Sequence, residues 1–129
     1  MVTSRLTRRE SGFAALAAIL AGGVPRPAWA HAHLAAASPA VDSTVRGAPR
    51  EVSITFTEKL EGKLSSIAVK DSAGRPVDAG NSALADASGK KLAVGLRSDI
   101  GTGKYTVSWV AVSVDTHRTT GSFGFTVSG

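Results

Sequence analysis

The sequence predicts a small all-β domain of the sandwich or barrel type. Short runs with alternating apolar residues recur along residues 51–129, and segments rich in Gly, Asp and Pro separate them. No stretch after residue 30 keeps a helical spacing of apolar residues over three turns. The sequence shows no internal repeat and no interdomain linker, so we expect one domain.

Each predicted strand carries apolar residues at every second position, which places them on one face because successive side chains point to opposite sides. The predicted inward residues are Val52, Ile54 and Phe56 in residues 51–58, Ile67 and Val69 in 65–71, Leu92, Val94 and Leu96 in 90–98, and Phe123, Phe125 and Val127 in 121–129. The predicted turns lie at residues 71–80, 86–90 and 99–104.

The run "KYTVSWVAVSVDTH", residues 104–117, changes its phase. Its two apolar sets are Tyr105, Val107 and Trp109, then Val110, Val112 and Val114. A slip of one residue predicts a β-bulge, or a crossing between sheets, near Trp109. Beyond the slip, Asp115 and His117 fall on the face opposite Val112 and Val114. We therefore expect both polar side chains to project to solvent together at the end of the strand.

Residues 1–30 have the features of an export signal. Three arginines (Arg5, Arg8 and Arg9) precede the apolar run 13–24, and Ala28 and Ala30 have the small side chains of a cleavage site. The apolar run is shorter than the roughly 20 residues that span a bilayer. We expect residues 1–30 to be removed, by the general or the twin-arginine route, leaving a periplasmic or extracellular domain of residues 31–129 without a membrane anchor.

Composition excludes several classes of site. Four of the 15 Lys and Arg and one of the ten Asp and Glu lie in residues 1–30, so the net charge falls from +5 to +2 in residues 31–129. This charge gives no basis for nucleic-acid binding. The absence of cysteine excludes thiolate metal sites and thiol nucleophiles. The one methionine is Met1, so the mature domain also lacks thioether ligands.

Histidine placement predicts a metal site. Cleavage after Ala30 would make His31 the first residue, and its backbone amine and Nδ1 can then chelate one ion. The other two histidines are His33 and His117, and Asp115 precedes His117 by two residues. Amine, two imidazoles and a carboxylate make a nitrogen-rich set that suits Cu(II). Because the amine must lose a proton, binding should weaken in acid.

His33 leaves a second copper site open. As the third residue of the mature chain, its imidazole could join the terminal amine and two deprotonated backbone amides in a square-planar clamp. That clamp needs no fold and would compete with His117. In an ordered first strand, however, the amide of His33 is committed to pairing, which favours the folded site.

The segments "HAHL…SP", "ITFTEKL" and "GTGKYTVSWVAVSVDTHRTTGSFGFTV" resemble the CopC family of bacterial exported copper-resistance proteins. The resemblance implies an antiparallel Greek-key β-barrel or sandwich with immunoglobulin-like, cupredoxin-like topology. It also implies a Cu(II) site formed by His31, Asp115 and His117, with Glu58 beside the copper as a supporting residue. Some family members have a Cu(I) site in a methionine-rich loop, which this sequence lacks.

Together these features predict an exported, non-catalytic monomer that binds one Cu(II) and sequesters or delivers copper, with a membrane copper transporter as the partner that the family implies. We expect no Cu(I) thioether site. Three alternatives remain at this point: the clamp through His33, a copper-dependent oxidative enzyme, and a metal-free immunoglobulin-like binding module.

Overall fold

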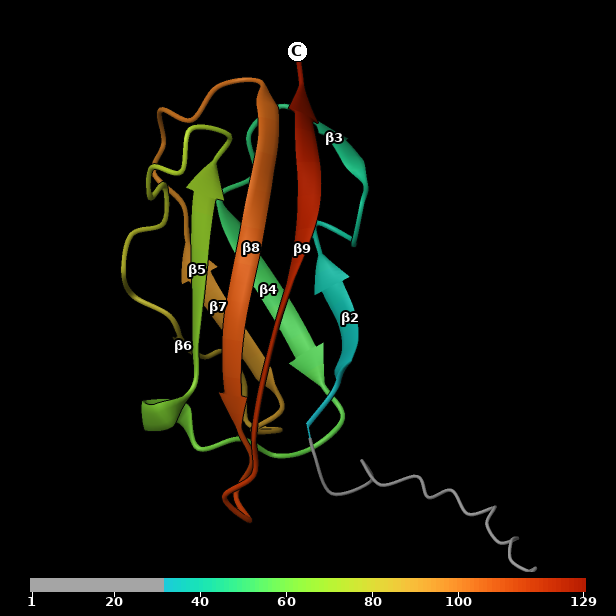
Figure 1. The fold of residues 1–129 in the computed structure, drawn as a ribbon, viewed down its shortest axis with the longest axis vertical. Helices are drawn as coiled ribbons and strands as arrows, with labels where there is room; N and C mark the ends of the chain where they lie inside the picture. Colours follow the sequence, from blue (N-terminus) through green and yellow to red (C-terminus); the bar gives the residue numbers. More distant parts are fainter. Residues whose placement is uncertain (1–31) are drawn as a thin grey trace, which may run out of the picture.

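Two four-stranded β-sheets pack face to face in the computed structural model, which describes residues 32–129 (Figure 1). The predicted export signal and His31 lie outside the described residues. The strands are β2 (Leu34–Ser38), β3 (Thr44–Arg46), β4 (Glu51–Phe56), β5 (Ser66–Asp71), β6 (Ala83–Leu84), β7 (Lys91–Gly95), β8 (Gly103–Val112) and β9 (Arg118–Ser128), and a 3-10 turn, η2 (Gly62–Leu64), precedes β5. Among the described residues, no helix is long and apolar enough to cross a membrane.

The strand order confirms an all-β sandwich. One sheet has the order β2-β4-β7-β6 and the other the order β3-β9-β8-β5, so the two sheets are separate and do not close into a barrel. The pairings are antiparallel with one exception. Residues 44–46 of β3 run parallel to residues 126–128 of β9, which corrects the expectation of antiparallel pairing throughout.

The core lies between the sheets and consists mainly of the predicted inward residues. Buried side chains alternate along β5, β7 and the second half of β9, as the period of two requires, and in β4 Ser53 is buried between the inward apolar residues. The core residues from these strands are Val52, Ile54, Phe56, Ile67, Val69, Leu92, Val94, Phe123, Phe125 and Val127. Leu96 follows the end of β7 and is only partly buried against this core.

The predicted bulge or sheet crossing near Trp109 is wrong. β8 and β9 pair without interruption from Gly103 opposite Val127 to Val112 opposite Arg118. The inward phase continues beyond Trp109 through Ala111, which is fully buried, and reaches Ser113 after the strand ends. The register shift that the described sheets do show lies in β2, between Leu34 and Ala36.

Trp109 closes the sandwich at the end where β4 and β8 both terminate. Its ring stands edge-on to Phe56, with ring centroids 5.1 Å apart and an interplanar angle of 72°. The ring also covers Gly121 on β9, where an added Cβ would lie 2.5 Å from a Trp109 ring carbon. Any larger side chain at Gly121 would therefore displace the tryptophan that covers this end of the core.

Candidate metal centre

Asp115 and His117 lie together in the tight turn between β8 and β9, at the lower end of the molecule in Figure 1. Nδ1 of His117 is 3.3 Å from Oδ1 of Asp115, and both side chains are about half exposed. This confirms that the two side chains project to solvent together. An imidazole beside a carboxylate on an accessible turn is a pair of donors that divalent copper accepts.

The turn is closed by main-chain hydrogen bonds. The backbone N–H of Ser113 donates to the carbonyl of His117 at 2.9 Å, and the N–H of Thr116 donates to the carbonyl of Ser113 at 2.7 Å. Thr116 has a φ of 73°, in the left-handed region that β-branched residues rarely occupy. Strained residues of this kind tend to occur where function fixes the backbone. Here the strain lies between the two candidate ligands.

Ser113 lies directly beneath the pair. Its side chain is buried, and its hydroxyl donates a short hydrogen bond to Oδ1 of Asp115. The hydroxyl oxygen of Ser113 also accepts a hydrogen bond from the backbone N–H of His117 at 3.3 Å. This hydroxyl, followed by the contact with His117, holds the pKa of the Asp115 carboxyl below its usual range. Asp115 is therefore prepared to present a negative charge at the surface.

The segment after β4 runs beside this turn. The N–H of Val114 donates to the carbonyl of Lys59 at 3.0 Å, and Leu60 forms a bridge with Ser113. Glu58 lies one residue before Lys59, so its backbone is close to the turn. The strand predicted for residues 51–58 ends earlier than expected, because β4 ends at Phe56, and Glu58 lies beyond it with its side chain exposed.

His33 is joined to the same segment from the other side. Its N–H donates to the hydroxyl of Thr57 at 3.0 Å, and its carbonyl accepts the N–H of Thr57 at 2.9 Å. The side chain of His33 is exposed. Since the amide of His33 is already paired within the fold, a copper clamp that deprotonates this amide would have to break that pairing.

Ala32, the first described residue, is anchored firmly in the fold. Its side chain is fully buried in the core, and its carbonyl accepts a 2.8 Å hydrogen bond from the hydroxyl of Thr119. Thr119 lies two residues after His117. Ala32 is therefore tied to the strand that begins directly after the candidate ligand.

Three chain segments thus converge at one end of the sandwich. They are residues 32–33, residues 57–60 and the turn 113–117 with the start of β9. Within residues 32–129, no group of three or more His, Cys, Asp and Glu side chains is arranged to hold a metal ion. The described residues supply the Asp115–His117 pair, whereas His31 lies outside them.

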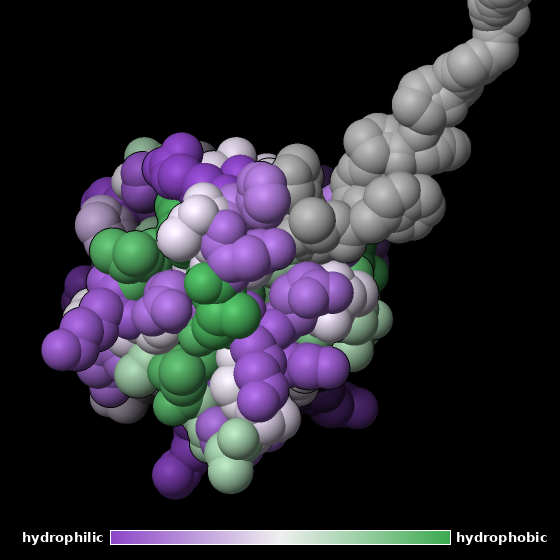
Figure 2. Space-filling model, turned by 90° about the horizontal axis from the view of Figure 1, so that it is seen from below, coloured by the Kyte–Doolittle hydropathy of each residue, from purple (hydrophilic) through white to green (hydrophobic). Residues whose placement is uncertain are grey.

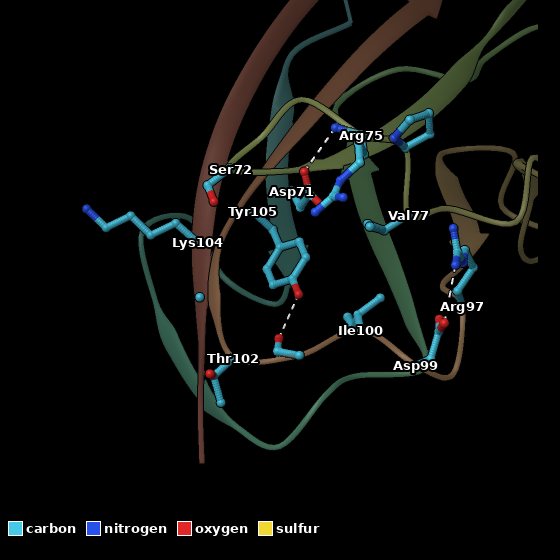
Figure 3. Close-up of a pocket in the computed structure, with 13 residues that line it drawn as sticks. Asp71, Ser72, Arg75, Val77, Arg97, Asp99, Ile100, Thr102, Lys104 and Tyr105 are labelled. Carbon is cyan, nitrogen blue, oxygen red and sulfur yellow. Dashed lines mark hydrogen bonds and ion pairs between the residues drawn. The ribbon is translucent and has the colours of Figure 1, made fainter.

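A polar cleft of about 470 Å³ lies at the opposite end of the sandwich, near Tyr105 at the start of β8 (Figure 3). Its guanidinium groups are paired, since Arg75 contacts Asp71 and Arg97 contacts Asp99, each at 3.2 Å. The hydroxyl of Tyr105 donates to the carbonyl of Gly101 at 2.6 Å. Each of these contacts lies within one loop, whereas the backbone N–H of Arg97 donates to the carbonyl of Val77 at 2.9 Å and joins the two loops. We therefore interpret the cleft as the junction of these loops.

Three hydroxyl residues at the candidate centre were not predicted from the sequence: Ser113, Thr119 and Thr57. Serine and threonine are common at strand ends, so their presence alone carries no signal. For Ser113 the signal was its phase, because it follows Tyr105, Val107, Trp109 and Ala111 at steps of two. A polar residue in a buried phase needs a hydrogen-bond partner, and Asp115 is the nearest polar side chain in sequence.

Comparisons with known proteins agree with this architecture. The model of the CopC domain family matches residues 34–128. Protein YobA of Escherichia coli strain K12 is 33% identical over 113 residues, which span 88% of this chain and 91% of that protein. Copper resistance protein C of Escherichia coli is 35% identical over 120 residues, which span 85% of this chain and 94% of that protein.

A solved structure is also similar. The crystal structure of PcoC, described as a methionine-rich copper resistance protein from Escherichia coli, superimposes with a TM-score of 0.69 at 33% identity. The match covers 76% of this chain and 99% of that one. The present chain differs from that description in composition, because its single methionine is Met1.

Proposed function

Because this chain belongs to the CopC domain family, whose relatives include copper resistance proteins, we propose that it is an exported protein that binds one Cu(II) ion and sequesters or delivers it outside the cytoplasm. The ligands are the terminal amine and imidazole of His31, the imidazole of His117 and a carboxylate oxygen of Asp115. The observation that carries the proposal is the 3.3 Å pair of Asp115 and His117 on an exposed turn.

The anchoring of Ala32 supports His31 as the third ligand residue. The hydrogen bond from Thr119 to the Ala32 carbonyl brings the start of the mature domain to the strand that follows His117. Removal of residues 1–30 would expose an amine at this position. Export and processing would therefore complete the site, and an unprocessed chain would lack one of its donors.

The donor set determines which copper ion is bound. Nitrogen and carboxylate oxygen donors suit Cu(II), whereas Cu(I) prefers the sulfur of cysteine and methionine. Residues 31–129 contain neither. We therefore propose one Cu(II) per mature chain and no thioether site for Cu(I), in contrast to the methionine-rich description of PcoC.

A binding role accounts for the centre better than catalysis. The pair lies on an exposed turn, and the carboxylate of Asp115 would occupy a copper position that oxygen activation requires open. The polar cleft lies at the far end of the sandwich, away from the proposed copper. We accordingly propose a copper carrier that is not an enzyme.

The receiving or supplying partner must approach the end that holds the site. Figure 2 shows this end from below, where several hydrophobic residues (green) lie among hydrophilic ones (purple) on the surface. Val114, adjacent to Asp115, is 54% exposed, and Leu64 of η2 is 61% exposed. The chain would act as a monomer that exchanges copper with a membrane copper transporter, the partner class that the family implies.

The test is a combined measurement on protein exported by a cell. The N-terminal mass should correspond to a chain that begins at His31, and this protein should bind one equivalent of Cu(II) with a nitrogen-rich EPR spectrum. Under anaerobic conditions it should hold Cu(I) poorly. A processed chain that binds no Cu(II), or that binds Cu(I) more tightly than Cu(II), would contradict the proposal.

A further inference from the structure

The hydroxyl of Ser113 is buried beneath the candidate ligands. The side chain of Ser113 is 1% exposed, although it belongs to the turn that carries the two exposed ligands. Its hydroxyl donates to Oδ1 of Asp115 and accepts the N–H of His117 at 3.3 Å, and its backbone N–H donates to the His117 carbonyl at 2.9 Å. One buried residue therefore contacts both candidate ligand residues.

These contacts determine how the Asp115 carboxylate is oriented. Both the hydroxyl of Ser113 and Nδ1 of His117 approach the same oxygen, Oδ1. This arrangement leaves Oδ2 as the carboxylate oxygen that can face a metal ion. An exposed aspartate without such contacts rotates among several conformers, and metal binding would then have to select one of them.

We propose that Ser113 is a positioning residue for copper. Its hydroxyl holds the Asp115 carboxylate in the ligating orientation, and with it the backbone of His117, before the metal arrives. The inference rests on the proposed Cu(II) site and adds to it a buried residue that contacts both ligand residues. Hydrogen-bond partners of metal ligands are worth about 10–100-fold in metal affinity, and we expect an effect of this size.

A purely structural role for Ser113 must be separated from a positioning role. Ser65 provides the matched control, because it is also a buried serine at this end of the sandwich, 5% exposed. Its hydroxyl accepts the N–H of Val112 at 3.0 Å and donates to the carbonyl of Glu61 at 2.9 Å. It stabilises the same strand end as Ser113. Its described hydrogen bonds go to Val112 and Glu61, whereas those of Ser113 go to Asp115 and His117.

The experiment compares Cu(II) affinities of mature chains that begin at His31. Ser113→Ala should weaken Cu(II) binding by roughly 10–100-fold and change the copper EPR parameters. Ser65→Ala should lower the unfolding midpoint while the affinity and EPR spectrum remain those of the wild type. Ser113→Thr keeps the hydroxyl and should restore most of the affinity. Equal affinities of the Ser113→Ala chain and the wild type would overturn the proposal.

A double-mutant cycle shows whether Ser113 acts through Asp115. In an Asp115→Ala background, Ser113→Ala should have a much smaller effect on affinity, since the carboxylate that it orients is gone. An undiminished effect would overturn positioning. If neither Asp115→Ala nor His117→Ala weakens copper binding, the proposed site itself is wrong, which is a different outcome from a silent Ser113→Ala.

A measurement on the wild type covers the case in which Ser113→Ala does not fold. The hydroxyl proton of Ser113 in the copper-free protein should exchange slowly with water and be observable by NMR, because it is buried and hydrogen-bonded. A hydroxyl proton in fast exchange would mean that Ser113 does not hold Asp115 in solution, and the proposal would fail.

Discussion

The hydroxyl of Thr119 donates a 2.8 Å hydrogen bond to the carbonyl of Ala32, joining two residues that are 87 positions apart in the sequence. Ala32 would be the second residue of the processed chain, and Thr119 lies two residues after His117. This one contact therefore links the N-terminal segment to the candidate copper turn. It predicts that copper affinity depends on a residue that need not contact the metal.

Replacing Thr119 with Val should weaken Cu(II) binding by roughly 2–10-fold, since a hydrogen bond contributes a net ~0.5–1.5 kcal/mol. Without the anchor, copper binding must itself order the N-terminal segment. Thr119→Ser should retain most of the affinity, and Thr120→Val, an exposed neighbour on the same strand, should leave it unchanged. Competition titrations provide the measurement, and a Thr119→Val chain with wild-type affinity would show that the anchor is irrelevant to the site.

Processing at residue 30 should also control copper binding. A chain with one extra glycine before His31 retains every side chain but moves the amine away from the His31 imidazole. We expect its Cu(II) affinity to fall by at least about tenfold. The fold is kept, but the chelate formed by the backbone amine and Nδ1 of His31 is lost. The melting temperature without copper should match that of the native chain. Equal affinities of the two chains would remove the amine from the ligand set.

Strand periodicity is a local property that the sequence shows directly, but it does not explain the exposure of Asp115 and His117. That exposure was inferred from a phase slip that β8 does not have, and both residues are exposed because they lie in the turn after β8 ends at Val112. Apolar residues at steps of two correctly assigned the buried faces of β4, β5, β7 and β9. The pair itself was found because an Asp and a His two residues apart point the same way at the end of a strand.

The errors arose where small or polar residues occupy core positions. Ala111 and Ser113 are buried in phase with Trp109, but neither reads as an apolar core residue, so the run appeared to slip and a bulge was predicted. The strand predicted for residues 51–58 was also two residues too long, so Glu58 lies outside β4. Only the pairing of the sheets shows where β4 ends.

Long-range contacts were beyond local reasoning. The parallel pairing of β3 with β9 joins segments more than 80 residues apart, and a three-residue strand carries little periodicity. The contacts of Thr57 with His33 and of Thr119 with Ala32 depend on the same global arrangement. The candidate ligands can be recognised from the sequence, whereas the residues that contact them are visible only in the tertiary structure.

Acid should release copper by protonating the amine of His31 before it affects Asp115. Hydrogen bonding by Ser113, and then by His117, lowers the pKa of the Asp115 carboxyl. A lowered folded-state pKa stabilises the fold above the ordinary carboxyl value, and this contribution is lost only as the pH falls through the lowered pKa. A terminal amine has an ordinary pKa of ~7.7–8.0.

We therefore expect Cu(II) affinity to fall steadily between about pH 8 and pH 5, over the range in which the amine takes up its proton. Asp115→Asn should bind more weakly at every pH but show the same slope. Acetylation of the N-terminus should flatten the slope. Competition titrations at several pH values provide the measurement, and a slope that disappears in the Asp115→Asn chain would contradict the assignment.

Substitutions of His117 and of His33 should distinguish the folded copper site from the terminal clamp. His117→Ala removes one of about four donors, and we expect a loss of about 2.5–4 kcal/mol in Cu(II) binding, since whole structural zinc sites are worth ~10–16 kcal/mol. His33→Ala should change the affinity little, because the structure uses the backbone of His33 to pair with Thr57. Copper should also raise the melting temperature of the wild type, since a folded site binds only the native state.

The clamp predicts the opposite order of effects. His33→Ala would then be the damaging change, His117→Ala would be mild, and copper would hardly alter the melting temperature, because three N-terminal residues bind it in the unfolded chain as well. EPR spectra of the two single mutants distinguish the ligand sets directly. The hydrogen bond from the His33 amide to Thr57 must break for the clamp to form. The folded site therefore has the energetic advantage as long as β2 remains paired with β4.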